Sequence, residues 1–365
     1  MPSTLDLIPL DSWLPAAATS PLVIAGPCSA ESEEQVMETA AALAAIPQVK
    51  VFRSGIWKPR TRPGAFEGVG IKGLKWLQKA KEQTGLPVTV EVANPQHVQE
   101  ALDHGIDILW IGARTVVNPF SVQEIGEAIG GRDIPVMVKN PLNPDLNTWM
   151  GAIERLNQSG LKRLVAIHRG FSFFNRTPYR NAPMWEIPIE LMRRCPGLPV
   201  LADPSHICGS RDLIQATVQK ALDLEMHGVM IETHINPARA LTDRNQQVTP
   251  EQLKEILSKL ILRRKTGSIE FANKLEELRS EIDKLDEELI DILARRMKVV
   301  EEIGAYKKAN RITILQLKRW SQLTKDRIEA GVRLGLSREF ILKLLESVHE
   351  EGIQRQIDVM NRDDA

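Results

Sequence analysis

The sequence predicts an α/β fold, a closed (β/α)8 barrel, followed by a small all-α domain of three helices. In the first two-thirds of the chain, short apolar runs rich in β-branched residues alternate with amphipathic stretches. About eight such units in about 250 residues indicate a closed parallel barrel. From Lys274 onward the apolar residues keep helical spacing and show no strand pattern. A doubly wound open sheet is the main alternative, but it usually has fewer strands and a glycine-rich phosphate loop after the first, which is not seen here.

The expected strands are near-continuous apolar runs that end in polar or Gly/Pro residues, as in a parallel sheet covered on both faces. They are Leu22–Ser29, Val49–Gly55, Pro87–Ala93, Ile108–Ala113, Pro135–Asn140, Arg163–Gly170, Leu198–His206 and Gly228–Ile235. The expected outer helices include Glu33–Ala45, Lys72–Thr84, Pro95–His104, Arg211–Glu225 and, as the last, Glu251–Leu262.

The expected organisation is a barrel over 1–262, a polar linker over 263–273 and a helical domain over 274–365. Apolar residues in steps of three and four predict a long first helix that runs to Ala309. They are Leu275, Leu278, Ile282, Leu285, Leu289, Ile292, Val299 and Ile303. Two further helices are expected over Gln316–Ala330 and Ser337–Met360, with Gly331 and Gly335 at the break between them.

The bulk composition gives no reason to expect a nucleic-acid or membrane partner. Lys+Arg and Asp+Glu are both 47 in 365 residues, so the formal net charge is zero. The chain shows neither a signal-peptide pattern nor an apolar run as long as a membrane span. Cys28, Cys195 and Cys208 are too few and too scattered for a disulfide framework. We therefore expect a cytoplasmic protein that binds small molecules.

Positive charge gathers where a barrel enzyme does its chemistry, at the carboxyl ends of the strands. The cationic residues at or just after expected strand ends are Arg53, Lys58, Arg60, Arg114, Lys139 and Arg169. Any one of them alone is most simply a solvated rim residue. Together they predict anionic ligands, because so much like charge in a concave site needs neutralising. Phosphates and carboxylates are the natural candidates.

A second set at these ends combines a thiol, an imidazole and two carboxylates, namely Cys28, His206, Glu232 and Asp243. Their spacing contains no local zinc signature, and a buried Cys or a lone His is more often a structural residue. However, the first, seventh and eighth strands become neighbours when the barrel closes. Mixed sulfur, nitrogen and oxygen ligands suit a borderline divalent ion such as Mn, Fe, Co or Zn. An open position on such an ion polarises a substrate carbonyl.

These motifs resemble a known family. The segments AGPCS, FRSGIWKPRT, IGART, VKN, HRG, DPSH and ETH, followed by Asp243, stand in the order found in 3-deoxy-D-arabino-heptulosonate 7-phosphate (DAHP) synthases of the short microbial, type I beta, form. That form is related to the 3-deoxy-octulosonate 8-phosphate synthases. The resemblance implies condensation of phosphoenolpyruvate with erythrose 4-phosphate. KPRT favours erythrose 4-phosphate over the arabinose 5-phosphate of the octulosonate enzymes, which resemble KANR there.

The resemblance also implies the ligand contacts. Cys28, His206, Glu232 and Asp243 would bind the metal, with Mn expected first. Phosphoenolpyruvate would contact Arg53, Lys58, Arg114, Lys139 and Arg169, with Lys58 also catalytic. Erythrose 4-phosphate would contact Lys58, Arg60 and Thr61. Pro141 departs from the family, which usually has glycine there, so the loop after Lys139 is expected to differ.

Polar residues interrupt the apolar pattern of the helical tail. Arg296 occupies a position where the first-helix ladder calls for an apolar residue, and Lys307 lies on the same face, about 20° away around the helix. Arg279 lies about 100° from Arg296 and would point elsewhere, such as into a partner subunit. Gln356 continues the apolar stripe of the third helix. A helical bundle with a few polar, register-setting residues explains these observations equally well.

The tail resembles the all-helical chorismate mutases. LEELRSEIDKLDEELIDILARRMKVVEEIGAYK resembles their first helix, and Arg279, Arg296, Lys307, Arg319 and Gln356 fall at the family spacing. The resemblance implies an intertwined homodimer in which these five residues bind chorismate or prephenate. Lys307 and Gln356 would be catalytic at the breaking ether oxygen, and no metal is needed. Two positions depart from the family, since Gln316 and Trp320 stand where acidic residues are usual.

Together the resemblances imply a bifunctional transferase and isomerase of aromatic amino acid biosynthesis, the shikimate pathway. The barrel would catalyse the step that opens the route to chorismate, and the tail would consume chorismate. We expect the helical domain also to sense prephenate or chorismate and to restrain the barrel allosterically. The alternative is a dimerisation and sensor module with little catalysis.

Overall fold

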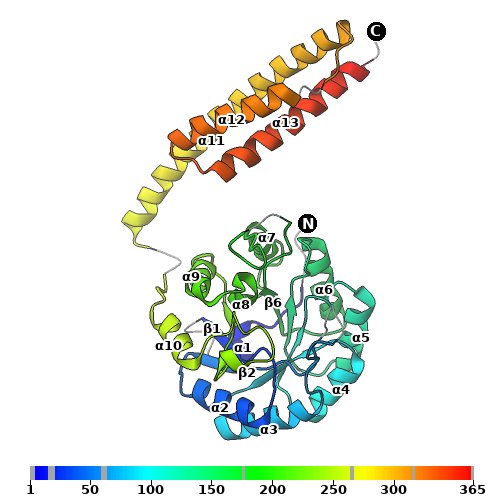
Figure 1. Ribbon diagram of the computed structural model, residues 1–365, viewed down its shortest axis with the longest axis vertical. Helices are drawn as coiled ribbons and strands as arrows, with labels where there is room; N and C mark the ends of the chain where they lie inside the picture. The colour runs from blue at the N-terminus through cyan, green and yellow to red at the C-terminus, as the bar shows by residue number, and fades with distance from the viewer. Residues whose placement is uncertain are drawn as a thin grey trace. The chain divides into compact units, whose positions relative to one another are not determined.

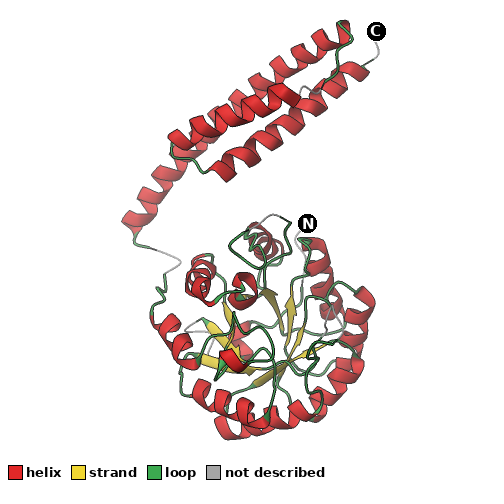
Figure 2. Cartoon of the chain, viewed as in Figure 1, coloured by secondary structure: helices red, strands yellow, loops and turns green. Residues whose placement is uncertain are grey.

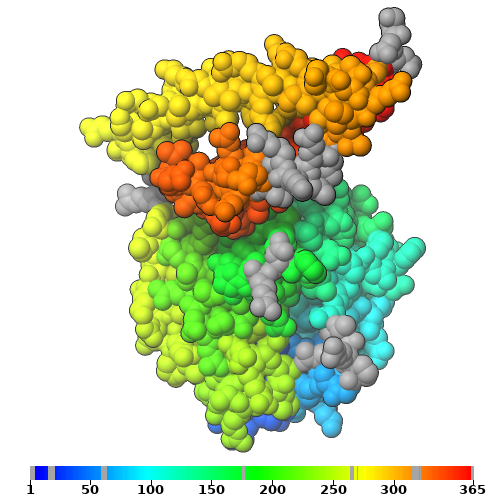
Figure 3. Space-filling model, turned by 45° about the horizontal axis from the view of Figure 1, so that its top comes forward, coloured from blue at the N-terminus to red at the C-terminus, as the bar shows by residue number. Residues whose placement is uncertain are grey.

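The computed structural model describes residues 5–14, 21–58, 64–174, 177–263, 267–314 and 317–362, without the side chains of residues 269, 317–319 and 321. The chain forms two compact units, Met1–Arg263 and Arg264–Ala365. Figure 3 colours the first unit from blue to yellow and the second from yellow to red. Among the described residues, no helix combines the length and apolar character needed to cross a membrane.

The first unit is a closed barrel of parallel strands in chain order (Figures 1 and 2). The strands are β1 Leu22–Gly26, β2 Val49–Arg53, β3 Val88–Val92, β4 Ile108–Ile111, β5 Val136–Lys139, β6 Leu164–His168, β7 Val200–Ala202 and β8 Gly228–Glu232. Closure comes from the pairing of β1 with β8, which sets Gly26 opposite Glu232. The predicted (β/α)8 barrel is confirmed, and the open-sheet alternative is wrong.

Helices cover the outside of the barrel (Figure 2). They are α2 Glu33–Ala44, α3 Lys72–Thr84, α4 Pro95–Asp103, α5 Pro119–Ile129, α6 Leu146–Gln158, α7 Glu186–Arg194, α9 Ile214–Asp223 and α10 Pro250–Ser258. The short α1 Leu10–Trp13 packs against the interior cluster, and α8 Pro204–Cys208 follows β7 at the mouth. Leu74 and Leu77 of α3 are fully buried against the strands, as helical spacing predicts. A separate apolar cluster, which includes Ile24, Val51 and Trp110, fills the barrel interior. The residues at the carboxyl ends of the strands therefore lie above a packed apolar interior.

The seventh strand is shorter than expected. It ends at Ala202, and His206 lies on helix α8 instead of at a strand end. The reason is local, because Asp203 caps this helix by accepting a hydrogen bond from the His206 backbone N, and Pro204 suits the first helical position.

The second unit consists of three helices, α11 Ile269–Ala309, α12 Leu317–Arg333 and α13 Arg338–Asn361. Helix α11 begins before the expected Lys274, because the Ser268 side chain caps it by accepting from the Phe271 backbone N. The second half of the segment expected as a linker is thus helical. Gly331 lies within α12, whereas Gly335, with φ +87°, makes the turn that follows it.

Candidate active sites of the two units

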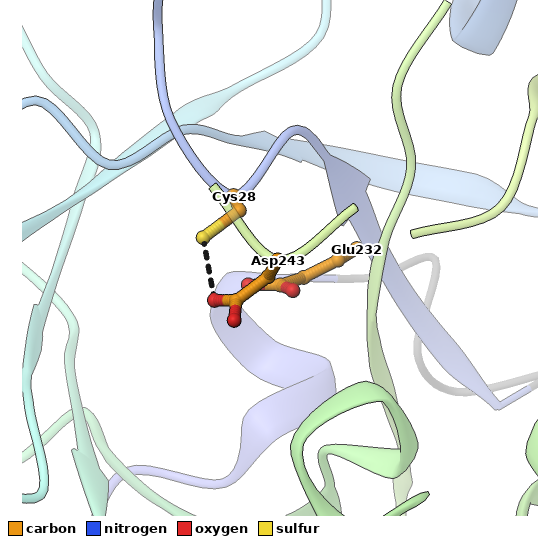
Figure 4. A group of neighbouring side chains, drawn as sticks. All are labelled: Cys28, Glu232 and Asp243. Atoms are coloured by element: carbon orange, nitrogen blue, oxygen red, sulfur yellow. Dashed lines mark hydrogen bonds between the residues drawn. The ribbon is translucent and has the colours of Figure 1, made fainter. Parts of the chain in front are cut away.

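A thiol and two carboxylates meet at the mouth of the barrel (Figure 4). One ligand atom each from Cys28, Glu232 and Asp243 lies within 4.8 Å of the others. The Cys28 Sγ donates a hydrogen bond to Asp243 Oδ2 at 3.2 Å. The pairing of β1 with β8 brings Cys28 and Glu232 together, and only glycine fits at position 26, where an added Cβ would lie 2.0 Å from the Arg53 carbonyl oxygen. The expected convergence of these three residues on one point is present.

His206 lies beside this cluster rather than within it. Its Nε2 is 3.7 Å from Glu232 Oε1, and its Nδ1 is 2.8 Å from Asp203 Oδ2. A carboxylate on the far side of an imidazole is the arrangement that commonly orients a metal-binding histidine. Asp203 therefore sets the direction in which the His206 Nε2 points.

The protonation states of the cluster are set by burial and by charge. Burial, reinforced by Glu232, raises the pKa of the Cys28 thiol to about 12. Burial alone would also raise the pKa values of Glu232 and Asp243, but neighbouring His206, with Arg53 beside Glu232 and Arg180 beside Asp243, holds both pKa values below their usual range. Two ionised carboxylates thus lie close together beside a protonated thiol.

The donor set fits a borderline divalent cation. Within the described part of the chain, Glu232 Oε1 accepts no hydrogen bond although it is buried, and Arg53 Nη2 is 3.4 Å away. An ion placed among these groups would satisfy that oxygen, offset the carboxylate repulsion and displace the thiol proton. Sulfur, oxygen and imidazole nitrogen together are typical ligands of such ions.

Four of the predicted cations, Lys58, Arg114, Lys139 and Arg169, line a cavity of about 90 Å³ next to the cluster. It is lined by Lys58, Glu91, Gly112, Ala113, Arg114, Lys139, Arg169, Arg180, His206 and Asp243. Lys139 is buried and pairs with Asp203 at 2.7 Å. Buried Arg53 lies 4.9 Å from the centre of the Trp110 ring. Arg114 is exposed, and Lys58 Nζ donates to Cys28 Sγ at 3.2 Å. Arg60 and Thr61 lie outside the described residues.

Several residues at the mouth were not singled out from the sequence. They are Glu91, Arg180, Asp203, Gln246 and Gln247. Asp203 stood within the DPSH motif, and its position three residues before a candidate ligand was a usable signal. Gln247 accepts from the Cys28 backbone N at 2.9 Å and shows no sequence signal, because the contact spans 219 residues.

The helical unit brings together some of its predicted site residues. Lys307 Nζ donates to Gln356 Oε1 at 3.1 Å and also to the Ile314 carbonyl. Arg296 Nη1 donates to the Val348 carbonyl at 3.4 Å. Both cations of α11 thus reach α13, which agrees with their small angular separation on the helix.

Arg279 does not join them among the described side chains. Arg279 is exposed, and its nearest acid is Glu276, 3.7 Å away on the same helix. The side chain of Arg319 and the whole of Gln316 lie outside the described residues. Trp320 stacks on His349 with ring centroids 3.8 Å apart. Its ring offers no carboxylate where the family usually has one.

Comparison with known proteins matches both units. A model of the DAHP synthetase I family matches residues 17–266, and a model of chorismate mutase type II matches residues 278–357. The chain is similar to the phospho-2-dehydro-3-deoxyheptonate aldolase of Thermotoga maritima, with 33% identity over 238 residues, which covers 65% of this chain and 68% of the relative.

One further relative, which bears a different name, and one solved structure also match the barrel. A 2-dehydro-3-deoxyphosphooctonate aldolase of Desulfatibacillum aliphaticivorans is 31% identical over 267 residues, covering 68% of this chain and 93% of the relative. The crystal structure of the Thermotoga maritima DAHP synthase superposes with a TM-score of 0.59 at 32% identity and covers 65% of this chain and 67% of that one.

Proposed function

Since the chain belongs to the DAHP synthetase I family and carries a chorismate mutase type II domain, we propose which of its residues perform each reaction. It is a bifunctional enzyme of the shikimate pathway. The barrel condenses phosphoenolpyruvate with erythrose 4-phosphate to DAHP and phosphate. The helical domain rearranges chorismate to prephenate.

The barrel uses a divalent ion held by Cys28, Glu232 and Asp243, with His206 as the fourth ligand. The approach of the first three within 4.8 Å of one another carries this proposal. The 3.7 Å between His206 Nε2 and Glu232 Oε1 supports the fourth. Mn is the preferred ion, and Fe, Co or Zn would suit the same ligands. The bound ion supplies a Lewis acid for the aldehyde carbonyl of erythrose 4-phosphate.

The cations of the cavity bind and orient phosphoenolpyruvate. Arg53, Arg114, Lys139 and Arg169, together with Lys58, neutralise its phosphate and carboxylate and hold C3 towards the aldehyde carbon. Arg53 and Lys139 are already fixed by Glu232 and Asp203, so little side-chain ordering is left for substrate binding. Much of the rate gain is therefore positioning and charge compensation.

Lys58 supplies a proton as the new bond forms. Burial alone lowers the pKa of its ammonium group, but Cys28 and Glu91 raise it above the ordinary value, so the group is charged at neutral pH. As C3 attacks the aldehyde carbon, Lys58 Nζ protonates the aldehyde oxygen, and the water that then adds to C2 gives up a proton to Lys58. The resulting hemiketal phosphate then expels inorganic phosphate. Arg60 and Thr61 hold the phosphate of erythrose 4-phosphate, an assignment that rests on the KPRT motif alone.

Removal of the metal tests the barrel proposal. Chelation with EDTA should abolish condensation, and a divalent ion should restore it. Full activity of stringently metal-free enzyme would contradict the assignment of the cluster. Turnover of erythrose 4-phosphate compared with arabinose 5-phosphate tests the role given to the KPRT motif, because the first should be strongly preferred.

The mutase site combines residues of two chains. Arg296, Lys307 and Gln356 come from one protomer, with Arg319 beside them, and Arg279 comes from the partner. In support, Arg279 is exposed and forms no hydrogen bond or ion pair with Arg296, Lys307 or Gln356 among the described side chains. Arg279 and Arg296 bind the substrate carboxylates, while Lys307 and Gln356 stabilise charge on the ether oxygen. Equilibrium sedimentation tests the homodimer, since a monomer at assay concentration would contradict it.

The helical domain also restrains the barrel when it binds prephenate or chorismate. In support, the chain joins the reaction that starts the route to chorismate with the one that consumes it. Added prephenate should inhibit condensation by the full-length protein but not by a 1–263 fragment. Equal activity with and without prephenate would reject this control. A cytoplasmic location is proposed as well, and the buried, unpaired state of all three cysteines supports it.

A further inference from the structure

Arg180 makes two hydrogen bonds at the edge of the metal cluster. Its Nη1 donates to Asp243 Oδ1 at 2.8 Å and to Gln246 Oε1 at 2.7 Å. Each guanidinium NH2 group carries two hydrogens, so one nitrogen can make both bonds at once. Asp243 Oδ2, the other oxygen of that carboxylate, faces Cys28. Arg180 therefore occupies the side of Asp243 that the cluster leaves open.

Gln246 extends this contact to the second carboxylate. Its side chain is 1% exposed, and its Nε2 donates to Glu232 Oε2 at 2.6 Å. Glu232 Oε1 is thereby left as the oxygen without a hydrogen bond in the described part of the chain. The hydrogen bonds made by Arg180 and Gln246 thus determine which oxygen of Asp243 and of Glu232 remains available to bind an ion.

Asp243 needs such support because its backbone is in an unfavourable conformation. Its φ is +48°, in the left-handed region that residues other than glycine rarely adopt. Asp is among the residues that tolerate this region best, yet the conformation persists only where surrounding contacts fix it. The bond to Arg180 is one of the few side-chain contacts that can do so.

The backbone of Arg180 is itself anchored. The Arg180 N donates to the Cys208 carbonyl at 3.2 Å, and the neighbouring Asn181 N donates to the Ile207 carbonyl at 3.1 Å. Both acceptors belong to α8, the helix that carries His206. Arg180 therefore links Asp243 directly, and Glu232 through Gln246, to helix α8, which carries the proposed fourth ligand His206.

We propose that Arg180 is a positioning residue that orients Asp243 directly, and Glu232 through Gln246, for divalent-ion binding. The inference rests on the metal site proposed above. Outer hydrogen bonds to ligand groups commonly account for about 10–100-fold in metal affinity. The guanidinium also repels a cation, but its side chain is half exposed, and solvent and salt screen that repulsion. Orientation therefore outweighs repulsion, and loss of Arg180 weakens binding.

The test is a titration of full-length, metal-stripped protein with Co²⁺. The thiolate-to-cobalt charge-transfer absorption reports ligation by Cys28, and its absence in Cys28→Ser would assign the band to this site. Calorimetry with Mn²⁺ gives an independent Kd. Arg180→Met should raise both Kd values about 10–100-fold. Arg180→Lys, which keeps the charge and one donor group, should fall in between. Gln246→Leu should weaken binding less than Arg180→Met does.

Arg114→Met is the matched control. Arg114 lines the same cavity and carries the same charge, but in the described part of the chain no hydrogen bond or ion pair joins it to the proposed ligands. Arg114→Met should change the metal Kd of the unaltered protein by no more than about twofold. If Arg114→Met weakens metal binding as much as Arg180→Met does, the effect comes from general charge and the inference is overturned. Unchanged or tighter binding in Arg180→Met, with an unchanged circular dichroism spectrum, would overturn it too. Failure of the unaltered protein to bind either ion would instead remove the metal site itself.

Discussion

The barrel buries and pairs several of its functional charges, whereas the helical unit leaves one of its functional charges, Arg279, exposed. In the barrel, Arg53, Lys139 and Glu232 are at most 5% exposed, and each has an oppositely charged group nearby in the same chain. In the helical unit, Arg279 is 62% exposed and pairs with Glu276, 3.7 Å away on its own helix. Those charges of the first site are thus paired within one chain, whereas Arg279 is left largely to solvent.

The apolar residues show the same difference. The barrel has a continuous core, but Val300, Ile328 and Ile341 are the large apolar side chains that the helical unit buries among the described residues. The ladder of α11 is largely exposed, with Leu278, Ile282, Leu285, Leu289, Ile292 and Ile303 each 45–57% accessible. Burying one such side chain stabilises by about 1.5–3 kcal/mol, so this stripe strongly favours a second protomer. The exposed stripe is consistent with the proposal that the mutase site forms between two protomers.

The largest expected effect is the loss of the metal-dependent condensation without loss of the metal-free mutase reaction. Glu232→Gln removes one carboxylate of the metal cluster and should lower condensation kcat about a thousandfold or more, because Lewis-acid stabilisation is worth several kcal/mol. Mutase kcat, measured on the same molecules, should stay within about twofold, since that reaction needs no metal. Loss of both activities together would show that the units are not independent.

The next largest effect tests the helical site. Lys307→Ala should lower mutase kcat about 100–1000-fold, as removal of one charge-stabilising donor does elsewhere, and leave condensation intact. Lys298→Ala, an exposed lysine on the same helix, is the matched control and should change neither rate. If the unaltered protein has no mutase activity and Lys307→Ala only weakens prephenate binding, the domain is a sensor and dimerisation module. The absence of a carboxylate at Trp320 gives that alternative its structural basis.

A third substitution tests whether the exposed stripe is a protomer contact. Ile282→Lys with Leu285→Lys places two charges on the stripe and should convert the dimer to a monomer in equilibrium sedimentation. Mutase activity should then fall at least tenfold, because Arg279 is lost from the site, while condensation continues. Glu287→Lys, on the opposite side of α11, should remain dimeric. A doubly substituted protein that sediments as a dimer would refute the stripe as the contact.

The smallest effects come from helix caps, one in each unit. Thr249 forms a capping box with Gln252 at the start of α10, and Ser337 caps α13 by accepting from the Phe340 backbone N. Substitution of either by Ala should cost about 1 kcal/mol of stability. Calorimetry should show that Thr249→Ala lowers only the barrel transition and Ser337→Ala only the helical one. A shift of both transitions by one substitution would mean that the units unfold together.

The sequence predicted what depends on local pattern. The strand runs alternate with amphipathic helices, so the barrel and the meeting of Cys28 with Glu232 followed from closure of the sheet. His206 was placed on a strand because the capping role of Asp203 within ADPSH was not recognised. Arg180 lies on a loop and joins Asp243 across 63 residues, which no periodicity reveals. The three-four spacing of the apolar residues predicts helix α11. That spacing does not tell whether the apolar face of the helix packs within the same chain or against a second protomer.

The most direct test of the metal centre is anomalous X-ray scattering from crystals soaked with Mn²⁺ and phosphoenolpyruvate. One peak should lie bonded to Cys28 Sγ, the Glu232 and Asp243 carboxylates and His206 Nε2, at about 2.0–2.4 Å from each ligand atom. An ordered phosphoenolpyruvate beside an empty cluster, or a peak bonded elsewhere, would contradict the account.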